Sequence, residues 1–216
     1  MSQKLLTIID YGMGNLHSVA KALECVAPNF TVEITSDRAR ILQADHVVLP
    51  GVGAIRDCMA EIRHQQVNEV VVENLASGKP FLGICVGMQA LMAHSDENQG
   101  VDCLNHFAGQ VHRFPSGLVD NHGLPMKVPH MGWNNVRKTT EHPLWPSIDS
   151  DSHFYFVHSF YVEANEDYSA GVCNYGADFA AMIYRDNIFA TQFHPEKSAD
   201  AGLQLLKNFT QWDGTL

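Results

Sequence analysis

The chain has 216 residues, of which 45% are hydrophobic and only 18% are charged, which excludes a disordered or collagen-like protein and allows a large core. The formal net charge is −10 and no basic run offsets it, so we expect no nucleic-acid partner. No apolar run reaches the roughly 18 residues that a membrane span needs, and the first residues lack a signal-peptide pattern. We therefore expect a cytoplasmic protein with no membrane partner. The five cysteines form no Cys-x-x-Cys pair, which is typical of reduced thiols.

The first half of the chain alternates strand patterns with helix patterns. Strands are predicted at residues 5–10, 31–35, 46–49 and 81–84. Helices are predicted at residues 16–26, 36–41, 55–63, 67–76 and 86–94, with Asn15 and Ser36 as candidate caps of the first two. This alternation indicates parallel strands joined by crossover helices, in a sheet that binds ligands at the carboxyl ends of its strands.

The second half consists mainly of short strand patterns between turns, which favours antiparallel or mixed pairing. The predicted strands cover residues 110–114, 126–128, 134–137, 154–157, 171–174, 180–184 and 188–193. A last helix is predicted at residues 201–212, because Leu205, Phe209 and Trp212 recur at helical spacing.

Residues 83–87 read Gly-Ile-Cys-Val-Gly between a predicted strand and a predicted helix. This is the pattern of a nucleophile elbow, with a cysteine at the nucleophile position. The glycines permit a sharp turn that exposes the Cys85 sulfur at the edge of the sheet, and the neighbouring helix N-terminus favours a thiolate there. The alternative is a buried structural cysteine between packing glycines, and the pentapeptide alone favours neither.

The second motif is His194-Pro195-Glu196, directly after a predicted strand. A proline disfavours the helical conformation of the residue before it, so we expect an extended segment with His194 and Glu196 on the same side. The carboxylate would then hold the imidazole tautomer while the other ring nitrogen faces a thiol. By itself the motif is more often an exposed turn. Together with Cys85 at the same sheet edge, it supplies a nucleophile, a base and an orienting group.

A third motif, Pro50-Gly51-Val52-Gly53, also follows a predicted buried strand. A backbone flanked by glycines can turn its N–H groups toward a developing oxyanion. Val52 or Gly53 would supply one donor and Val86 another. The alternative is an ordinary tight turn.

Neither a cofactor nor a metal ion is expected. Gly12-Met13-Gly14 precedes a helix as in dinucleotide-binding proteins, but His17 stands at the third glycine position and no acidic residue ends the next strand. The twelve histidines form no His-Glu-x-x-His motif and there is no cysteine pair for a metal site. Trp133 is either a core residue or an exposed interface anchor.

The chain closely resembles the class I, or triad, glutamine amidotransferases in three segments, LPGVG, GICVGMQ and FHPEKS. Three further segments, IDYGMGNL, PHMGWN and YFVHSF, are similar to the glutaminase subunits of imidazole glycerol phosphate synthases within that family. The similarity extends from Leu5 to about Phe209. Together with the element pattern, it predicts a single α/β domain over residues 1–216. The expected architecture is a three-layer sandwich whose largely parallel central sheet is flanked by helices, with a smaller antiparallel or mixed region in the second half.

The resemblance implies that Cys85 is the nucleophile, His194 the base and acid, and Glu196 the orienting carboxylate. It implies that the oxyanion hole is formed by Val52, Gly53 and Val86. It implies that glutamine is held by Gly53, Gln89, Glu97 and Ser159. It places at the partner interface Asn15, Trp133 and Lys197.

The implied reaction is hydrolysis of L-glutamine to L-glutamate and ammonia. The ammonia would pass to a cyclase subunit in a heterodimer that forms imidazole glycerol phosphate and aminoimidazole carboxamide ribotide in histidine biosynthesis. Two positions depart from the family pattern, because Val86 stands where leucine is usual and Phe160 where tyrosine is usual. Two alternatives stay open: a subunit of another amidotransferase, such as pyridoxal phosphate synthase, and a non-catalytic binding module with the same fold.

Overall fold

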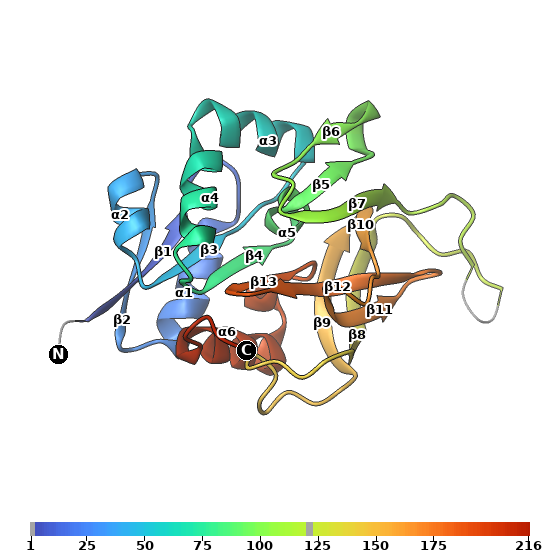
Figure 1. Cartoon of the computed structure of the whole chain (residues 1–216). Helices are drawn as coiled ribbons and strands as arrows, with labels where there is room; N and C mark the ends of the chain where they lie inside the picture. The colour runs from blue at the N-terminus through green and yellow to red at the C-terminus, as the bar shows by residue number, and fades with distance from the viewer. Residues whose placement is uncertain (1–2, 120–122) are drawn as a thin grey trace.

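The computed structural model describes residues 3–119 and 123–216. Within these ranges the strands form one 13-stranded sheet, whose main path is β2-β1-β3-β4-β13-β12-β10-β7-β5-β6 (Figure 1). The first five strands of this path run parallel, and most of the remaining pairs are antiparallel. The predicted α/β class, with a largely parallel sheet and a second mixed region, is confirmed.

The parallel part is formed by strands rich in branched and aromatic side chains, which suit a pleated and buried surface. It consists of β1 (Lys4–Ile9), β2 (Phe30–Thr35), β3 (His46–Leu49), β4 (Phe81–Ile84) and β13 (Ile188–Thr191). Every residue of β3, β4 and β13 is buried. This is expected where helices cover both faces of a parallel sheet.

Helices cover the two faces of the parallel part (Figure 1). On one face α1 (Leu16–Val26) packs against α6 (Ala199–Gln211). On the other face α4 (Val67–Ala76) contacts both α2 (Arg38–Gln43) and α3 (Ile55–His64). Each helix buries one apolar stripe, such as Val19 and Leu23 in α1.

The second region extends the same sheet. Its strands are β5 (Met92–Ser95), β6 (Val101–Asp102), β7 (Phe107–Arg113), β8 (His130–Lys138), β9 (Ser152–His158), β10 (Phe160–Glu163), β11 (Ser169–Asn174) and β12 (Asp178–Arg185). Strands β11, β8 and β9 branch from β12. Three short elements complete the chain: α5 (Val86–Ala90) connects β4 to β5, η1 (Glu97–Gln99) lies between β5 and β6, and η2 (Pro195–Lys197) lies between β13 and α6.

Several local predictions are wrong. The helix predicted at residues 86–94 ends at Ala90, and the chain continues into β5, because β5 pairs with β7. Residues 126–128 form no strand, and Pro129, which follows them, has no N–H to give to a strand pair. The strand β10 was not predicted.

The predicted helix caps also differ from the structure. Asn15 occupies the N-cap position of α1, but its side chain makes no capping hydrogen bond. The N-cap of α2 is Asp37 rather than Ser36, and its carboxylate accepts from the Arg40 N–H at 3.0 Å. A carboxylate is favoured at this position because the first N–H groups of a helix have no partner within it.

No helix in the described part of the chain is long and apolar enough to cross a bilayer.

Candidate active site

Cys85 occupies the sharp turn between β4 and α5. Its φ of 55° lies in a region that residues other than glycine rarely adopt, and such strain is typical of functional sites. The turn is held because the Cys85 N–H donates to the Thr191 carbonyl of β13 at 2.7 Å. A Cβ atom on Gly87 would overlap the Leu49 carbonyl, so close packing requires a glycine at that position. The predicted elbow is therefore present.

His194 and Glu196 lie beyond the carboxyl end of β13, which is next to β4 in the sheet. The His194 Nδ1 atom lies 2.9 Å from Glu196 Oε1, and the two side chains are 3% and 0% exposed. A carboxylate only accepts hydrogen bonds, so Nδ1 carries a proton. Burial lowers the pKa of His194, but its interactions with the Cys85 side chain and with Glu196 outweigh burial and raise the pKa to about 10. This direction favours the protonated, positively charged form of the His194 ring.

The predicted extended conformation holds for His194 but not for the residues after it. His194 has φ −97° and ψ 99°, whereas Pro195 begins the 3₁₀ turn η2. A proline suits the first position of a helical turn, where its missing N–H costs nothing. Glu196 thus reaches Nδ1 across a turn rather than along a strand.

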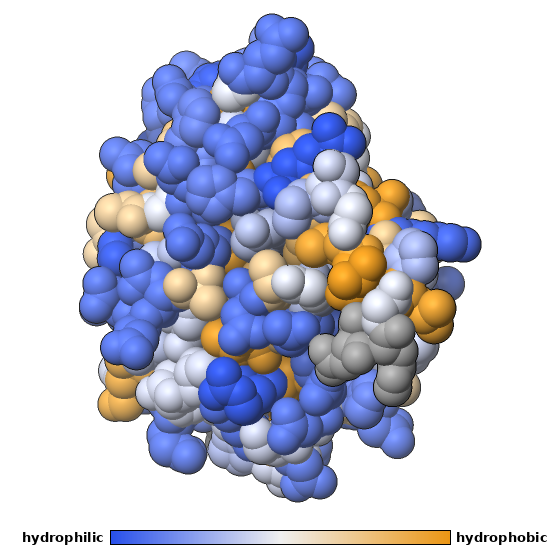
Figure 2. All heavy atoms as spheres, turned by 90° about the vertical axis from the view of Figure 1, so that its right-hand side faces the viewer, coloured by the Kyte–Doolittle hydropathy of each residue, from blue (hydrophilic) through white to orange (hydrophobic). Residues whose placement is uncertain are grey.

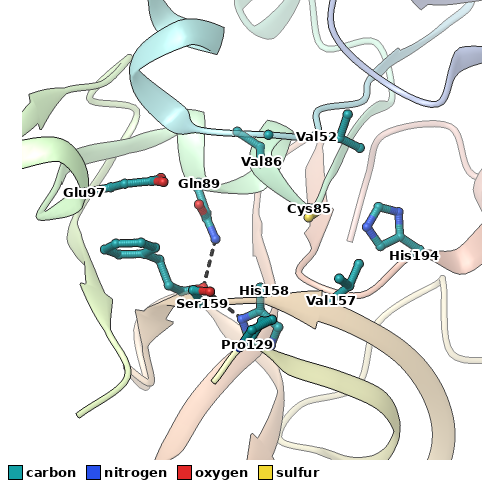
Figure 3. Close-up of a pocket in the computed structure, with 12 residues that line it drawn as sticks. Val52, Cys85, Val86, Gln89, Glu97, Pro129, Val157, His158, Ser159 and His194 are labelled. Atoms are coloured by element: carbon teal, nitrogen blue, oxygen red, sulfur yellow. Dashed lines mark hydrogen bonds between the residues drawn. The ribbon is translucent and has the colours of Figure 1, made fainter. Parts of the chain in front are cut away.

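Cys85 and His194 line the same cavity, which has a volume of about 320 Å³. In Figure 3 the Cys85 sulfur and the His194 ring point toward one another at one end of this cavity. All residues that the sequence predicts for the oxyanion hole and for glutamine binding also line it, namely Val52, Gly53, Val86, Gln89, Glu97 and Ser159. The structure thus brings together residues from both halves of the sheet.

The Pro50–Gly53 segment is held by two buried donors below the cavity. The Tyr11 hydroxyl donates to the Pro50 carbonyl at 2.8 Å, and the Cys58 thiol donates to the Val52 carbonyl at 3.4 Å. Burial raises the pKa of Tyr11, and it raises that of Cys58 to about 11, so both groups keep the protons that they donate. Nearby, Val86 is the first residue of α5, and its N–H has no partner within the helix.

Gln89 and Glu97 are fixed on the opposite side of the cavity. The Gln89 Nε2 donates to the Phe160 carbonyl at 3.0 Å and to Gln192 Oε1 at 2.9 Å. Glu97 Oε2 accepts from the Ile55 N–H at 3.1 Å, and its carboxylate points toward Gln89 (Figure 3). A fixed carboxylate and a fixed amide are suited to hold the polar ends of a small ligand.

A family model described as glutamine amidotransferase class-I matches residues 7–212 of the chain. The chain belongs to the class I glutamine amidotransferase family. The predicted family is thereby confirmed.

Curated relatives of this amidotransferase are similar along almost their whole length. This chain is 56% identical over 210 residues to "Imidazole glycerol phosphate synthase subunit HisH" of Pseudomonas putida, and the match covers 97% of this chain and 98% of the relative. It is 57% identical over 210 residues to "Imidazole glycerol phosphate synthase subunit HisH 1" of Pseudomonas aeruginosa, covering 97% of each protein.

Solved structures share the fold of this amidotransferase at low sequence identity. The "Structure of PurLQS from Thermotoga maritima" superposes with a TM-score of 0.74 at 15% identity, over 97% of this chain and 99% of that one. A glutamine amidotransferase from Thermotoga maritima superposes with a TM-score of 0.61 at 14% identity, over 98% and 84%.

Two of the three residues predicted at a partner interface of this amidotransferase lie on one surface. Trp133 and Tyr155 are cross-strand neighbours on β8 and β9, with ring centroids 6.1 Å apart. The Lys197 ammonium lies 6.0 Å from the Tyr155 ring centroid, within reach of a cation–π contact. Asn15 instead borders a small recess beside His194 and Glu196.

Sequence reasoning missed two buried polar side chains at the site of this amidotransferase. His158 lines the cavity, and burial lowers its pKa to about 3. Gln192 donates to the Cys85 sulfur, with its Nε2 3.8 Å from Sγ. One feature of the sequence could have indicated Gln192: it stands two residues before His194. In an extended chain, side chains two residues apart lie on the same side, so Gln192 and His194 would both face the site.

Proposed function

We propose that this chain, acting as one domain over residues 1–216, is the glutaminase subunit of an imidazole glycerol phosphate synthase. In this role it hydrolyses L-glutamine to L-glutamate and ammonia for histidine biosynthesis. One observation carries the proposal: Cys85 and His194 line one cavity, and the second ring nitrogen of His194 is held at 2.9 Å by the buried Glu196 carboxylate. The HisH names of near full-length relatives favour this synthase over another amidotransferase.

In the first half of the reaction, the Cys85 thiolate attacks the side-chain amide carbon of glutamine. The carbonyl oxygen becomes an oxyanion, which accepts from the N–H of Val86 and from an N–H of the Val52–Gly53 segment. When the C–N bond breaks, the His194 imidazolium protonates the departing nitrogen and ammonia leaves. The products of this step are a thioester on Cys85 and a neutral His194.

In the second half, a water molecule hydrolyses the thioester. His194 takes one proton from the water as the oxygen attacks, and Glu196 stabilises the imidazolium that forms. The bond to sulfur then breaks, releasing glutamate and restoring the thiolate–imidazolium pair. Glu196 itself stays ionised throughout and fixes the ring tautomer.

The other end of glutamine carries an ammonium and a carboxylate, which need partners of opposite or complementary polarity. The Glu97 carboxylate pairs with the α-ammonium group, because the two groups carry opposite charges. The Ile55 N–H holds this carboxylate in position. Both N–H groups of Gln89 are engaged, so its Oε1 atom accepts from the same ammonium group, while Ser159 and the Gly53 backbone hold the α-carboxylate. These assignments place the reactive amide next to Cys85.

Ammonia released into water is protonated or lost, so it must be used by a partner, for which we propose the cyclase subunit. Five of the exposed large hydrophobic residues lie close together in sequence: Val119, Leu124, Val128, Met131 and Trp133. Figure 2 shows hydrophobic side chains gathered on this side of the molecule. Exposed apolar groups of this kind mark interaction sites, and they favour a partner protein bound at β8 and at the segment that precedes it.

The proposal is tested by measuring ammonia release from glutamine with and without the cyclase. We expect weak activity alone, a large gain with the cyclase and its ligand, and no turnover for Cys85→Ala, which should keep the fold. Parent-like ammonia release by Cys85→Ala would refute the nucleophile. A fully active isolated chain would refute the coupling to the cyclase.

Two further measurements distinguish the alternatives. A glutamine-analogue electrophile should modify Cys85, as read by mass spectrometry, and the absence of an adduct would favour a non-catalytic binding module. A pull-down from native lysate should recover the cyclase, and recovery of a pyridoxal phosphate synthase subunit would favour that enzyme instead.

A further inference from the structure

Gln192 is a completely buried amide next to the nucleophile, with an exposed fraction of 0%. It lies in the short segment between β13 and His194. Its Nε2 atom lies 3.8 Å from Cys85 Sγ, and its Oε1 atom lies 2.9 Å from Gln89 Nε2. A buried amide loses its hydrogen bonds to water, so both of its ends need partners in the protein.

The orientation of the Gln192 amide follows from its neighbours. The Phe160 carbonyl can only accept, so the atom of Gln89 that lies 3.0 Å from it is the NH₂ group. That NH₂ group also faces Gln192, which must present its oxygen there. The Gln192 NH₂ group is therefore turned toward the Cys85 sulfur.

The Phe160 carbonyl is itself held firmly. It accepts a second hydrogen bond from His158 Nδ1 at 2.8 Å, so the Nε2 atom of this neutral ring is an acceptor. His130 Nδ1 donates to that nitrogen at 2.9 Å. Every donor in this set of contacts faces an acceptor, so the framework behind Gln89 and Gln192 has one consistent arrangement.

We infer that Gln192 is a further catalytic residue, whose amide donates to the Cys85 thiolate and at the same time holds Gln89 in place. The inference rests on the proposed glutaminase function. A hydrogen-bond donor favours the charged thiolate over the neutral thiol. A neutral amide stabilises the thiolate without competing with His194 for its role as the acid.

The central test is the pH dependence with which iodoacetamide alkylates Cys85. The reaction is followed by mass spectrometry on the Cys85 peptide, because the exposed Cys25 also reacts with iodoacetamide. In Gln192→Met, which removes the donor at similar length, the alkylation midpoint should rise by about one pH unit. In Gln89→Met the Gln192 donor remains but loses the contact that orients it, so that midpoint should rise by less than in Gln192→Met.

Glutaminase kinetics in the cyclase complex give an independent readout. Gln192→Met should lower kcat about tenfold, the effect of one lost hydrogen bond to a charged group. Gln89→Met should mainly raise KM. The matched control is Gln204→Met on α6, which removes an amide that donates to Asn208 at 2.8 Å. It should leave the midpoint, kcat and KM unchanged.

The outcomes separate this inference from the proposed function. If the parent is active and a folded Gln192→Met variant has the same alkylation midpoint and the same kcat, Gln192 has no catalytic role. An inactive parent complex would refute the proposed function, while the alkylation profile would still report on Gln192. If Gln192→Met fails to fold, Gln192→Asn retains an amide that is too short to reach the sulfur, and it should show the same rise in midpoint. A parent-like midpoint in that variant would also overturn the inference.

Discussion

His130 Nδ1 lies 2.9 Å from His158 Nε2, and both residues are buried. The two residues are direct cross-strand neighbours on β8 and β9. Burial lowers the pKa of His130 to about 4 and that of His158 to about 3. Both rings are therefore neutral at pH 7, and the pair acts as a hydrogen-bonded unit rather than as a charge.

These two histidines predict acid sensitivity. Their folded-state pKa values lie below the ordinary value near 6.5, so the unfolded chain binds more protons than the folded chain between about pH 6.5 and pH 4. The free energy of unfolding should fall as pH decreases through that window, by up to about 1.4 kcal/mol per pH unit for each histidine. Urea unfolding at a series of pH values measures the slope. His130→Phe should make the slope shallower, and an unchanged slope would contradict the assignment.

Glu196→Gln tests the orienting carboxylate. The amide can donate as well as accept at the position 2.9 Å from His194 Nδ1, so it no longer enforces the required tautomer. We expect kcat for ammonia release in the cyclase complex to fall by roughly 10²–10⁴-fold, as for comparable triads. Glu141→Gln, an exposed carboxylate on the surface, is the control and should retain parent activity. A kcat for Glu196→Gln within about a factor of two of the parent value would show that Glu196 is not part of the triad.

Gly87→Ala tests the packing of the elbow. The added Cβ would overlap the Leu49 carbonyl, a backbone atom that no side-chain rotation can move away. Overpacking of this kind should cost about 3 kcal/mol or more of the free energy of unfolding. Gly78→Ala is the comparison, because φ is +76° there and nothing lies within 4 Å of the added atom. It should cost only the conformational strain of roughly 1–2 kcal/mol. Equal losses in thermal or urea unfolding would argue against close packing at Gly87.

Trp133→Ala tests the proposed cyclase surface. Trp133 is 52% exposed, so its removal should leave the unfolding temperature unchanged. Large aromatic anchors commonly contribute enough to an interface that truncation weakens binding about tenfold or more. Titration of the cyclase against glutaminase activity gives the apparent affinity. Val72→Ala truncates an exposed apolar side chain elsewhere, on α4, and should bind the cyclase with the parent affinity. Parent-like binding by Trp133→Ala would move the interface elsewhere.

Local patterns predict the parallel part of the sheet well. The strands β3 and β4 have the predicted bounds, since each is a short apolar run and Pro50 and Pro80 mark the adjoining turns. Helix α4 likewise has its predicted bounds, where Gly78 stops the helical pattern. In these elements the hydrophobic period and the turn residues indicate the same structure, and no distant contact opposes them.

Predictions fail where distant pairing overrides the local pattern. Residues 92–95 follow a helical pattern, yet they form β5 because their backbone pairs in parallel with β7. The strand β10 forms between β7 and β12, neither of which is its neighbour in sequence. A pattern of side chains cannot reveal such partners, because backbone hydrogen bonds carry no sequence signature.

The candidate site divides in the same way. Cys85, His194 and Glu196 stand in short motifs whose residue types and spacing already indicate nucleophile, base and orienting group. Gln192 belongs to no such motif, and its contact with the sulfur exists only because β13 lies beside β4 in the sheet.

The amino-acid sequence by itself determined which chemical groups are available, which short elements carry them, and to which family the chain is similar. Tertiary structure alone decided that a thiol, an imidazole and two amides from segments far apart in the chain meet around one cavity. The physical reason is that residue type and nearby residues determine the chemical groups and the local conformation. The distance between residues far apart in the chain instead depends on strand order and on buried hydrogen bonds across the whole sheet.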